Sequence, residues 1–263
     1  MAKEKGGAVG ASRHISWSYR EGKKTEGVPW GPHNLPLSLD LAGVSIVVEK
    51  NEHGFLYRRN SSGGSVEKAI MGDKGSFYFN PVEPLHVPAG ISTQLLVEFD
   101  RPVVVEPRAS KEILVTFPLE LACVIDRRRA GKHVLDIFSF CRSKFTLYGN
   151  VRNGLVCKYW KSAVYASRPP VNPLEKGILK IEIQNSLGRW SEVHRVVLSA
   201  FGMKIYYGPD LVSLNAAIKI NSDLNAETNF TDRPLQSGML KALEQFSSKL
   251  LSQQGRTVME EGY

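Results

Sequence analysis

The sequence has 263 residues, which is enough for one large core or two smaller ones, and its composition is that of an ordinary globular chain. Lys and Arg number 34 against 26 Asp and Glu, and the formal charge of +8 favours acidic or polyanionic partners over basic ones. No uninterrupted apolar run approaches the roughly 18 residues that a membrane-spanning helix needs. We therefore expect no direct membrane insertion.

The first 30 residues combine Gly, Lys, Ser and Glu with little apolar periodicity, which predicts a flexible leader. They lack the apolar stretch of a secretory signal. The three cysteines, Cys123, Cys141 and Cys157, form no CxxC pair and lie in strand-like runs, as small buried hydrophobes of a reducing compartment do. We expect a cytoplasmic protein.

Residues 31–235 alternate short β-branched and aromatic runs with Gly, Pro, Asn and Asp breaks. This pattern predicts a mainly β protein, and we expect an antiparallel β-sandwich. The proline-rich segment 167–177 either divides two lobes or caps a long connection. The predicted strands are 37–49 with a break near Gly43, 55–59, 76–79, 91–99, 103–105, 113–117, 121–125, 133–140, 144–148, 155–165, 178–183, 190–201, 204–207 and 211–220.

Residues 236–263 break the β pattern. Apolar residues recur there mostly at spacings of three and four, namely Met239, Leu240, Leu243, Phe246, Leu250 and Leu251. The spacing predicts an amphipathic C-terminal helix over 237–254, followed by a loose tail. Such a helix packs on its own domain or docks into the groove of a partner.

Motifs for catalysis and cofactor binding are missing from the sequence. The six histidines show no HxH or HExxH spacing, no phosphate-binding glycine loop opens a helix, and no GxSxG elbow occurs. The glycine-rich SSGGS at 61–65 predicts a hairpin tip. We therefore expect no cofactor and no metal.

Two acidic features leave an enzymatic interpretation open. His86, with Glu83 nearby in a proline-flanked segment, is either a loop base or ligand, or a structural histidine, which we favour. Five carboxylates crowd residues 98–120, and two acids across a β cleft would suit a hydrolase. Weak ion pairs at strand ends explain the same residues.

Basic residues gather in two places. The turn DRRRAGKH, residues 126–133, carries three consecutive arginines, and residues 140–165 form a predicted hairpin that interleaves basic and aromatic side chains. Alternation predicts that Lys158 shares a face with Trp160. In the non-functional interpretation, the basic turn is simply solvated and the aromatic side chains of the hairpin belong to a sandwich core. The candidate binding residues are Arg127, Arg128, Arg129, Arg142, Lys144, Lys158 and Trp160.

Five stretches resemble those of a known family. They are KGSFYFNPVEPLHVP, LLVEFDRPVVVEPR, KEILVTFPLELACVI, FCRSKFTLYGNVRNGLVCKYW and SAFGMKIYY. Over roughly residues 30–207 the chain resembles the largely archaeal family called domain of unknown function 432. The resemblance implies a β-rich cytoplasmic protein and supplies no activity or site. Members are sometimes encoded beside mechanosensitive channels, which implies a channel subunit as one possible partner.

These observations favour a non-catalytic binding or regulatory module that recognises an anionic surface. Two kinds of surface fit, RNA, including a ribosomal surface, and an acidic protein face. The alternatives are a cytosolic accessory protein of a mechanosensitive channel and a hydrolase with paired carboxylates.

Overall fold

A computed structural model describes residues 29–72, 75–127, 131–246 and 256–263. The described chain is mainly β and contains no helix, so it has no helix that could cross a membrane. It divides into two compact units, a smaller one spanning Asn34–Lys74 and a larger one made of Val28–His33 and Gly75–Tyr263. The proline-rich segment 167–177 lies inside the larger unit.

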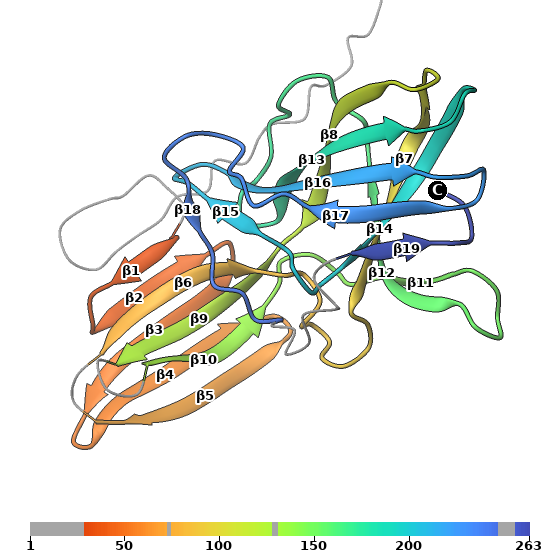
Figure 1. The fold of residues 1–263 in the computed structure, drawn as a ribbon. Helices are drawn as coiled ribbons and strands as arrows, with labels where there is room; N and C mark the ends of the chain where they lie inside the picture. Colours follow the sequence, from red (N-terminus) through yellow and green to blue (C-terminus); the bar gives the residue numbers. More distant parts are fainter. Residues whose placement is uncertain (1–28, 73–74, 128–130, 247–255) are drawn as a thin grey trace, which may run out of the picture. The chain divides into compact units, whose positions relative to one another are not determined.

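The smaller unit is a four-stranded antiparallel sheet in which neighbours in the sequence are neighbours in space (Figure 1). Its strands are β2 (Leu37–Leu41), β3 (Val44–Asn51), β4 (Gly54–Ser61) and β5 (Gly64–Met71). The break predicted near Gly43 is confirmed as a turn in which this glycine adopts a φ of 89°, a value that favours a residue without Cβ. The predicted hairpin tip at 61–65 joins β4 to β5, a strand that the sequence analysis missed.

The larger unit contains three sheets. The first is wholly antiparallel, has the order β1-β6-β9-β10, and is called the β6 sheet below. Its strands are β1 (Gly31–His33), β6 (Ser76–Val82), β9 (Glu120–Arg127) and β10 (Gly131–Phe138).

The second sheet, called the β7 sheet below, has the order β11-β12-β7-β14. Its strands are β7 (Gln94–Val105), β11 (Phe145–Tyr148), β12 (Leu155–Ser162) and β14 (Ser191–Ser199). β11 and β12 form the predicted hairpin, but β12 runs parallel to β7. The expectation of purely antiparallel pairing is therefore wrong for this sheet.

The third sheet, called the β13 sheet below, also mixes directions, because β13 pairs with β8 antiparallel and with β16 parallel. Its path is β18-β15-β16-β13-β8, and β17 pairs with both β16 and β19. The strands are β8 (Ser110–Pro118), β13 (Lys176–Asn185), β15 (Ile205–Tyr207), β16 (Val212–Ile220), β17 (Ala226–Phe230), β18 (Leu240–Lys241) and β19 (Thr257–Met259).

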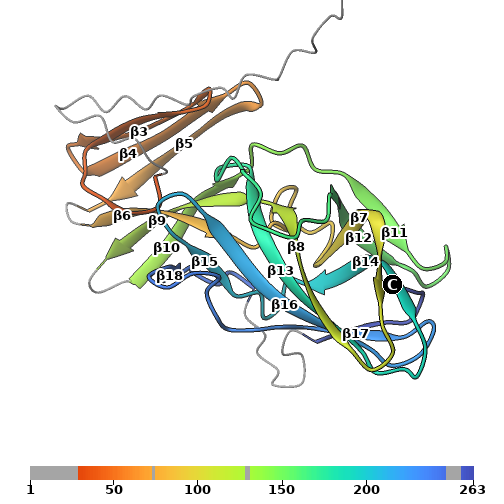
Figure 2. The same ribbon diagram turned by 90° about the horizontal axis from the view of Figure 1, so that it is seen from above.

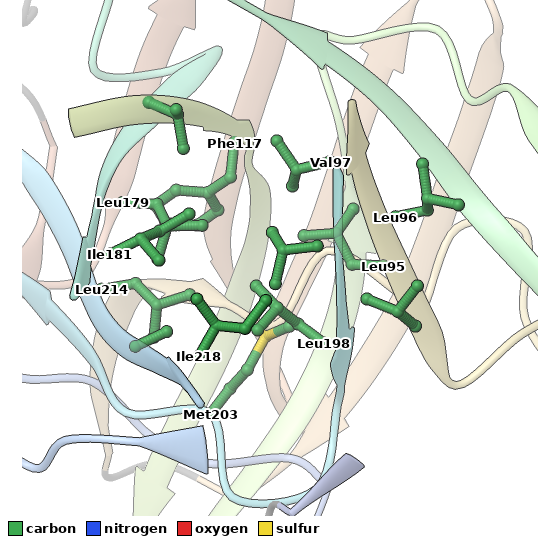
Figure 3. Packing of buried hydrophobic residues seen from close by; sticks show 14 of the residues in the cluster. Leu95, Leu96, Val97, Phe117, Leu179, Ile181, Leu198, Met203, Leu214 and Ile218 are labelled. Carbon is green, nitrogen blue, oxygen red and sulfur yellow. The ribbon is translucent and has the colours of Figure 1, made fainter. Parts of the chain in front are cut away.

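The main core forms where side chains of the β7 sheet meet those of the β13 sheet. Figure 3 shows Phe117, Leu179 and Ile181 facing Val97 and Leu198 across this core. Along β13, Leu179, Ile181 and Ile183 are buried while Glu182 and Gln184 are exposed, which confirms the period-two alternation of this strand. This core fixes the position of β12, which flanks β7.

The predicted C-terminal helix is wrong over residues 237–246, and residues 247–254 lie outside the described chain. Within residues 237–246 a short strand forms at Leu240–Lys241, and the other residues adopt turns or irregular backbone. Leu240 and Lys241 pair with β15, Ala242 joins the main core, and Leu243 packs on a small cluster of Val82, Ala122 and Val124. Ala242 and Leu243 therefore contact different apolar clusters, so these side chains do not need to share one face of a helix.

Candidate functional site

The predicted arginine tip lies between β9 and β10, as expected for a charged turn. Arg127 ends β9, is half-buried and pairs in register with Gly131, whereas Arg128 and Arg129 lie outside the described residues. In both ribbon views the end of β9, where Arg127 lies, and the β11–β12 hairpin are at different ends of the larger unit (Figures 1 and 2). Of the predicted arginine tip, the described residue Arg127 therefore does not share a surface with the hairpin.

Arg142 and Lys144 lie just before β11, and both side chains are exposed. Within the described chain no carboxylate lies within ion-pair distance of either one, in contrast to basic residues on other strands such as Lys180, which pairs with Glu112 at 2.6 Å. Arg152, in the turn after β11, is exposed as well. These three cations are therefore displayed to solvent at the two ends of one short strand.

Lys158 does not belong to this exposed set, and its assignment to the binding surface is corrected here. Its side chain is only 3% exposed, and its Nζ donates to Glu120 Oε1 at 2.7 Å and to the Val87 carbonyl at 3.2 Å. A cation inside a protein needs such a partner because burial removes its hydration. Lys158 is thus committed to the interior.

Trp160 is also unavailable as a stacking platform. The ring is half-buried, its Nε1–H donates to Thr116 Oγ1 at 3.1 Å, and Lys176 Nζ lies 5.8 Å from the ring centroid. Tyr148 is buried too, and its hydroxyl donates to the Gly262 carbonyl and accepts from the Glu261 amide. Trp160 and Tyr148 therefore serve mainly packing, as the core interpretation expected of them.

Apolar side chains that were not predicted as site residues occupy the exposed part of the hairpin. Phe145 and Leu147 on β11 are 37% and 40% exposed, and Val156, which lies opposite Leu147, is 47% exposed. Because cross-strand partners and residues two apart share a face, these three continue the face that carries Lys158. Ser92 Oγ donates to the Val156 carbonyl, which brings the half-exposed Ile91 close by.

We call this region the β11 edge surface, made of Phe145, Leu147 and Val156 with Arg142, Lys144 and Arg152. The sequence contains a signal for it, because no Asp or Glu occurs between Asp136 and Glu175. An acid-free stretch of this length around exposed apolar strands concentrates positive potential at one place. Of the candidate residues in this hairpin, Arg142 and Lys144 are exposed, whereas Lys158 is buried and Trp160 is half-buried.

A buried charged cluster lies behind the hairpin. Glu120 accepts the backbone N–H groups of His86 and Val87 at 2.8 and 3.1 Å, in addition to Lys158. Glu83, 1% exposed, accepts the backbone N–H groups of Gln245 and Phe246 at 2.9 and 3.3 Å. Both carboxylates are therefore saturated by groups that hold loops in place.

His86 joins the same cluster from the loop after β6. Its Nε2 lies 3.4 Å from Glu83 Oε2, and its ring stacks on Phe246 with centroids 4.5 Å apart. These contacts tie the loop to the segment after β18, which supports the structural interpretation of this histidine. The described residues contain no cluster of three or more His, Cys, Asp or Glu side chains that could hold a metal ion.

The crowded carboxylates of residues 98–120 are mostly engaged in ion pairs. Glu106 and Glu112 lie 3.7 and 2.6 Å from Lys111 and Lys180. A cavity of about 360 Å³ is lined by Glu98, Phe99, His194, Arg195, Gly262 and Tyr263. Among these described lining residues, Glu98 supplies the single acidic side chain, so this cavity does not present the two facing acids that a glycosidase needs.

The described residues define a mainly β protein that exposes a basic and apolar edge. A family model described as a protein of unknown function (DUF432) matches residues 29–260, and the chain belongs to this family. Comparison with curated proteins found no match, and comparison with solved structures found none either.

Proposed function

We propose that the protein is a non-catalytic binding module that recognises an acidic protein segment through the β11 edge surface. The observation that carries this proposal is the exposure of Phe145, Leu147 and Val156 between cations that lack an ionic partner in the described chain. Exposed apolar groups rimmed by charge mark protein contact sites, and the charge selects acidic partners. The proposal includes a cytoplasmic location, which the free cysteines support.

RNA is the less favoured anionic partner. Single-stranded nucleic acid is held by exposed rings on which bases stack, together with cations that track the phosphates. In this hairpin Trp160 and Tyr148 are engaged by other groups, and the exposed positions are occupied largely by aliphatic side chains. Aliphatic groups contribute little to stacking and much to protein contacts.

Two alternative proposals stay beside this one. The channel-accessory proposal used a terminal helix or an exposed sheet edge, and residues 237–246 form no helix, so for these residues the sheet edge is the route that remains. The hydrolase proposal depended on two carboxylates facing each other across a cleft, and the described cavity offers Glu98. As to architecture, we propose a β-sandwich for the two sheets that share the main core, and the packing in Figure 3 supports it.

The test is an affinity pull-down from native lysate with three baits, with and without nuclease. The baits are the wild-type protein, Arg142→Glu/Lys144→Glu, and the matched control Lys50→Glu/Lys219→Glu, which makes the same change in net charge at exposed positions outside the hairpin. We expect a protein that the wild type and the control retain, that the hairpin variant loses, and that about 0.5 M salt elutes.

Two results would contradict the proposal. Equal recovery by the hairpin variant and the control would remove the β11 edge surface from the interaction. Loss of the bound protein after nuclease treatment would show that RNA is the direct partner.

A further inference from the structure

We propose that the partner is an extended peptide segment that adds as a strand to the outer edge of β11, an inference that rests on the proposed function. Strand addition uses backbone hydrogen bonds for affinity and alternate side chains for specificity. Three observations support it: the direction of the free backbone groups, the regularity of this edge, and the distribution of charge along it.

The direction follows from the pairing register. Phe145 pairs with Lys158 in the antiparallel β11–β12 ladder, and the Tyr159 N–H donates to the Lys144 carbonyl at 2.8 Å. In such a ladder, hydrogen-bonded pairs alternate with pairs whose backbone groups point away. The backbone N–H and C=O groups of Phe145 and Leu147 therefore point away from β12, toward the outer edge.

No described strand occupies that edge, since β11 is the terminal strand of the β7 sheet. In both ribbon views β11 lies at the margin of this sheet, with β12 on its inner side (Figures 1 and 2). Two donors and two acceptors are thus presented in a row at the spacing that an added strand requires.

Two other edge strands of the larger unit, β10 and β8, carry features that disturb or cover an edge, and β11 carries neither. The register shift between Val134 and Asp136 leaves an extra residue on β10, a bulge-like irregularity that disturbs this edge. On β8, Leu114 makes a bridge to Tyr165. The four pairs between β11 and β12 show no register shift.

β11 is also held as a fixed template. The turn after it is closed by the Gly154 N–H donating to the Asn150 carbonyl at 2.7 Å and by Asn150 Oδ1, which accepts the N–H groups of Arg152 and Asn153. Tyr148 is anchored through its hydroxyl to the segment at Glu261 and Gly262. A preformed edge lowers the ordering cost of binding.

The charge pattern defines the chemistry of the occupant. Arg142 and Lys144 precede the strand and Arg152 follows it, with Phe145 and Leu147 between them. The complementary segment has apolar or β-branched residues in its centre and acidic residues at both ends. A second copy of this chain would place like charges opposite one another if the two β11 strands paired, so we assign the edge to an acidic partner.

The probe for the test is a fluorescent peptide, Asp-Asp-Val-Thr-Val-Thr-Val-Asp-Asp, titrated with the full-length protein and followed by anisotropy. Its control has the same sequence with N-methyl groups on alternate central residues, which blocks pairing and keeps the charge. The protein variants are Leu147→Pro, which removes an outward N–H, and Leu147→Ala, which keeps it. Arg142→Glu/Lys144→Glu reports on charge alone.

We expect N-methylation and Leu147→Pro each to weaken binding by about tenfold or more, and Leu147→Ala to weaken it less. If charge reversal weakens binding while N-methylation does not, strand addition is wrong and recognition of an acidic partner stands. If the peptide does not bind, or binds the charge-reversed protein equally well, both proposals fail. The methylated peptide decides the matter even if Leu147→Pro does not fold.

Discussion

At the scale of single residues, Lys158 shows what a sequence pattern leaves undetermined. Alternation correctly groups Lys158 with Trp160, but it does not state which face meets solvent. The answer depends on Glu120, which lies 38 residues away and supplies the carboxylate that makes burial of the ammonium tolerable. Partners so distant in sequence leave no local signal, and this explains why the exposed apolar residues of the hairpin were missed.

Replacement of Lys158 by Met should lower the free energy of unfolding by about 3–5 kcal/mol, because it leaves Glu120 buried without its cation. The double variant Lys158→Met/Glu120→Gln should recover part of this loss, since it removes the buried charge and its amide oxygen can still accept from one of the two loop N–H groups. Urea unfolding of the two variants measures both effects. A loss below about 1 kcal/mol for Lys158→Met would contradict the buried ion pair.

The thiol of Cys157 should be nearly inert in the native protein. Burial raises its pKa to about 11, and the nearby Arg195 charge, which lowers the pKa, only partly opposes this effect. The thiolate is the reactive form, so about one molecule in a thousand is reactive at pH 8. Iodoacetamide labelling followed by peptide mass spectrometry should find Cys157 modified slowly until urea unfolds the protein. Rapid labelling under native conditions would show that the site is open.

At the scale of elements, predictions succeeded where one local pattern decides the structure. The turn at Gly43 follows from the conformational freedom of glycine, and the alternation along β13 follows from the two-residue period of a strand. Both are determined by residues close together in the sequence. The segment 239–246 failed because apolar spacing of three and four also suits an extended chain whose side chains meet separate sheets. β5 was missed because most of its side chains are polar or exposed.

Gly154 should be irreplaceable in the turn of the β11–β12 hairpin. A Cβ at this position would lie 2.5 Å from the Asn150 carbonyl oxygen and 2.8 Å from that of Tyr148, both of them backbone atoms. We expect Gly154→Ala to cost about 1–3 kcal/mol of unfolding free energy and to abolish partner binding. Gly188→Ala, where nothing lies within 4 Å of the added atom, is the matched control. Equal thermal stability of the two variants would contradict the tight turn.

At the scale of the whole molecule, the class of the fold could be read from the sequence and the arrangement of the sheets could not. Short β-branched runs between turn residues predict strands, but they do not state which distant strands pair. The parallel pairs β12–β7 and β13–β16 and the division around Asn34–Lys74 depend on long-range contacts. The β11 edge surface is a mixed case. Its positive charge can be read from the sequence, but the sequence does not show that β11 is the terminal strand of its sheet.

The parallel pairing of β7 with β12 also affects biosynthesis. When β7 leaves the ribosome, its neighbours β12 and β14 have not yet been translated, and β14 ends more than a hundred residues after β7 begins. Its apolar residues Leu95 and Val97 must wait in an unpaired state, which is slow to resolve and open to aggregation. We therefore expect β7 to lack both of its sheet neighbours until Ser199 has emerged.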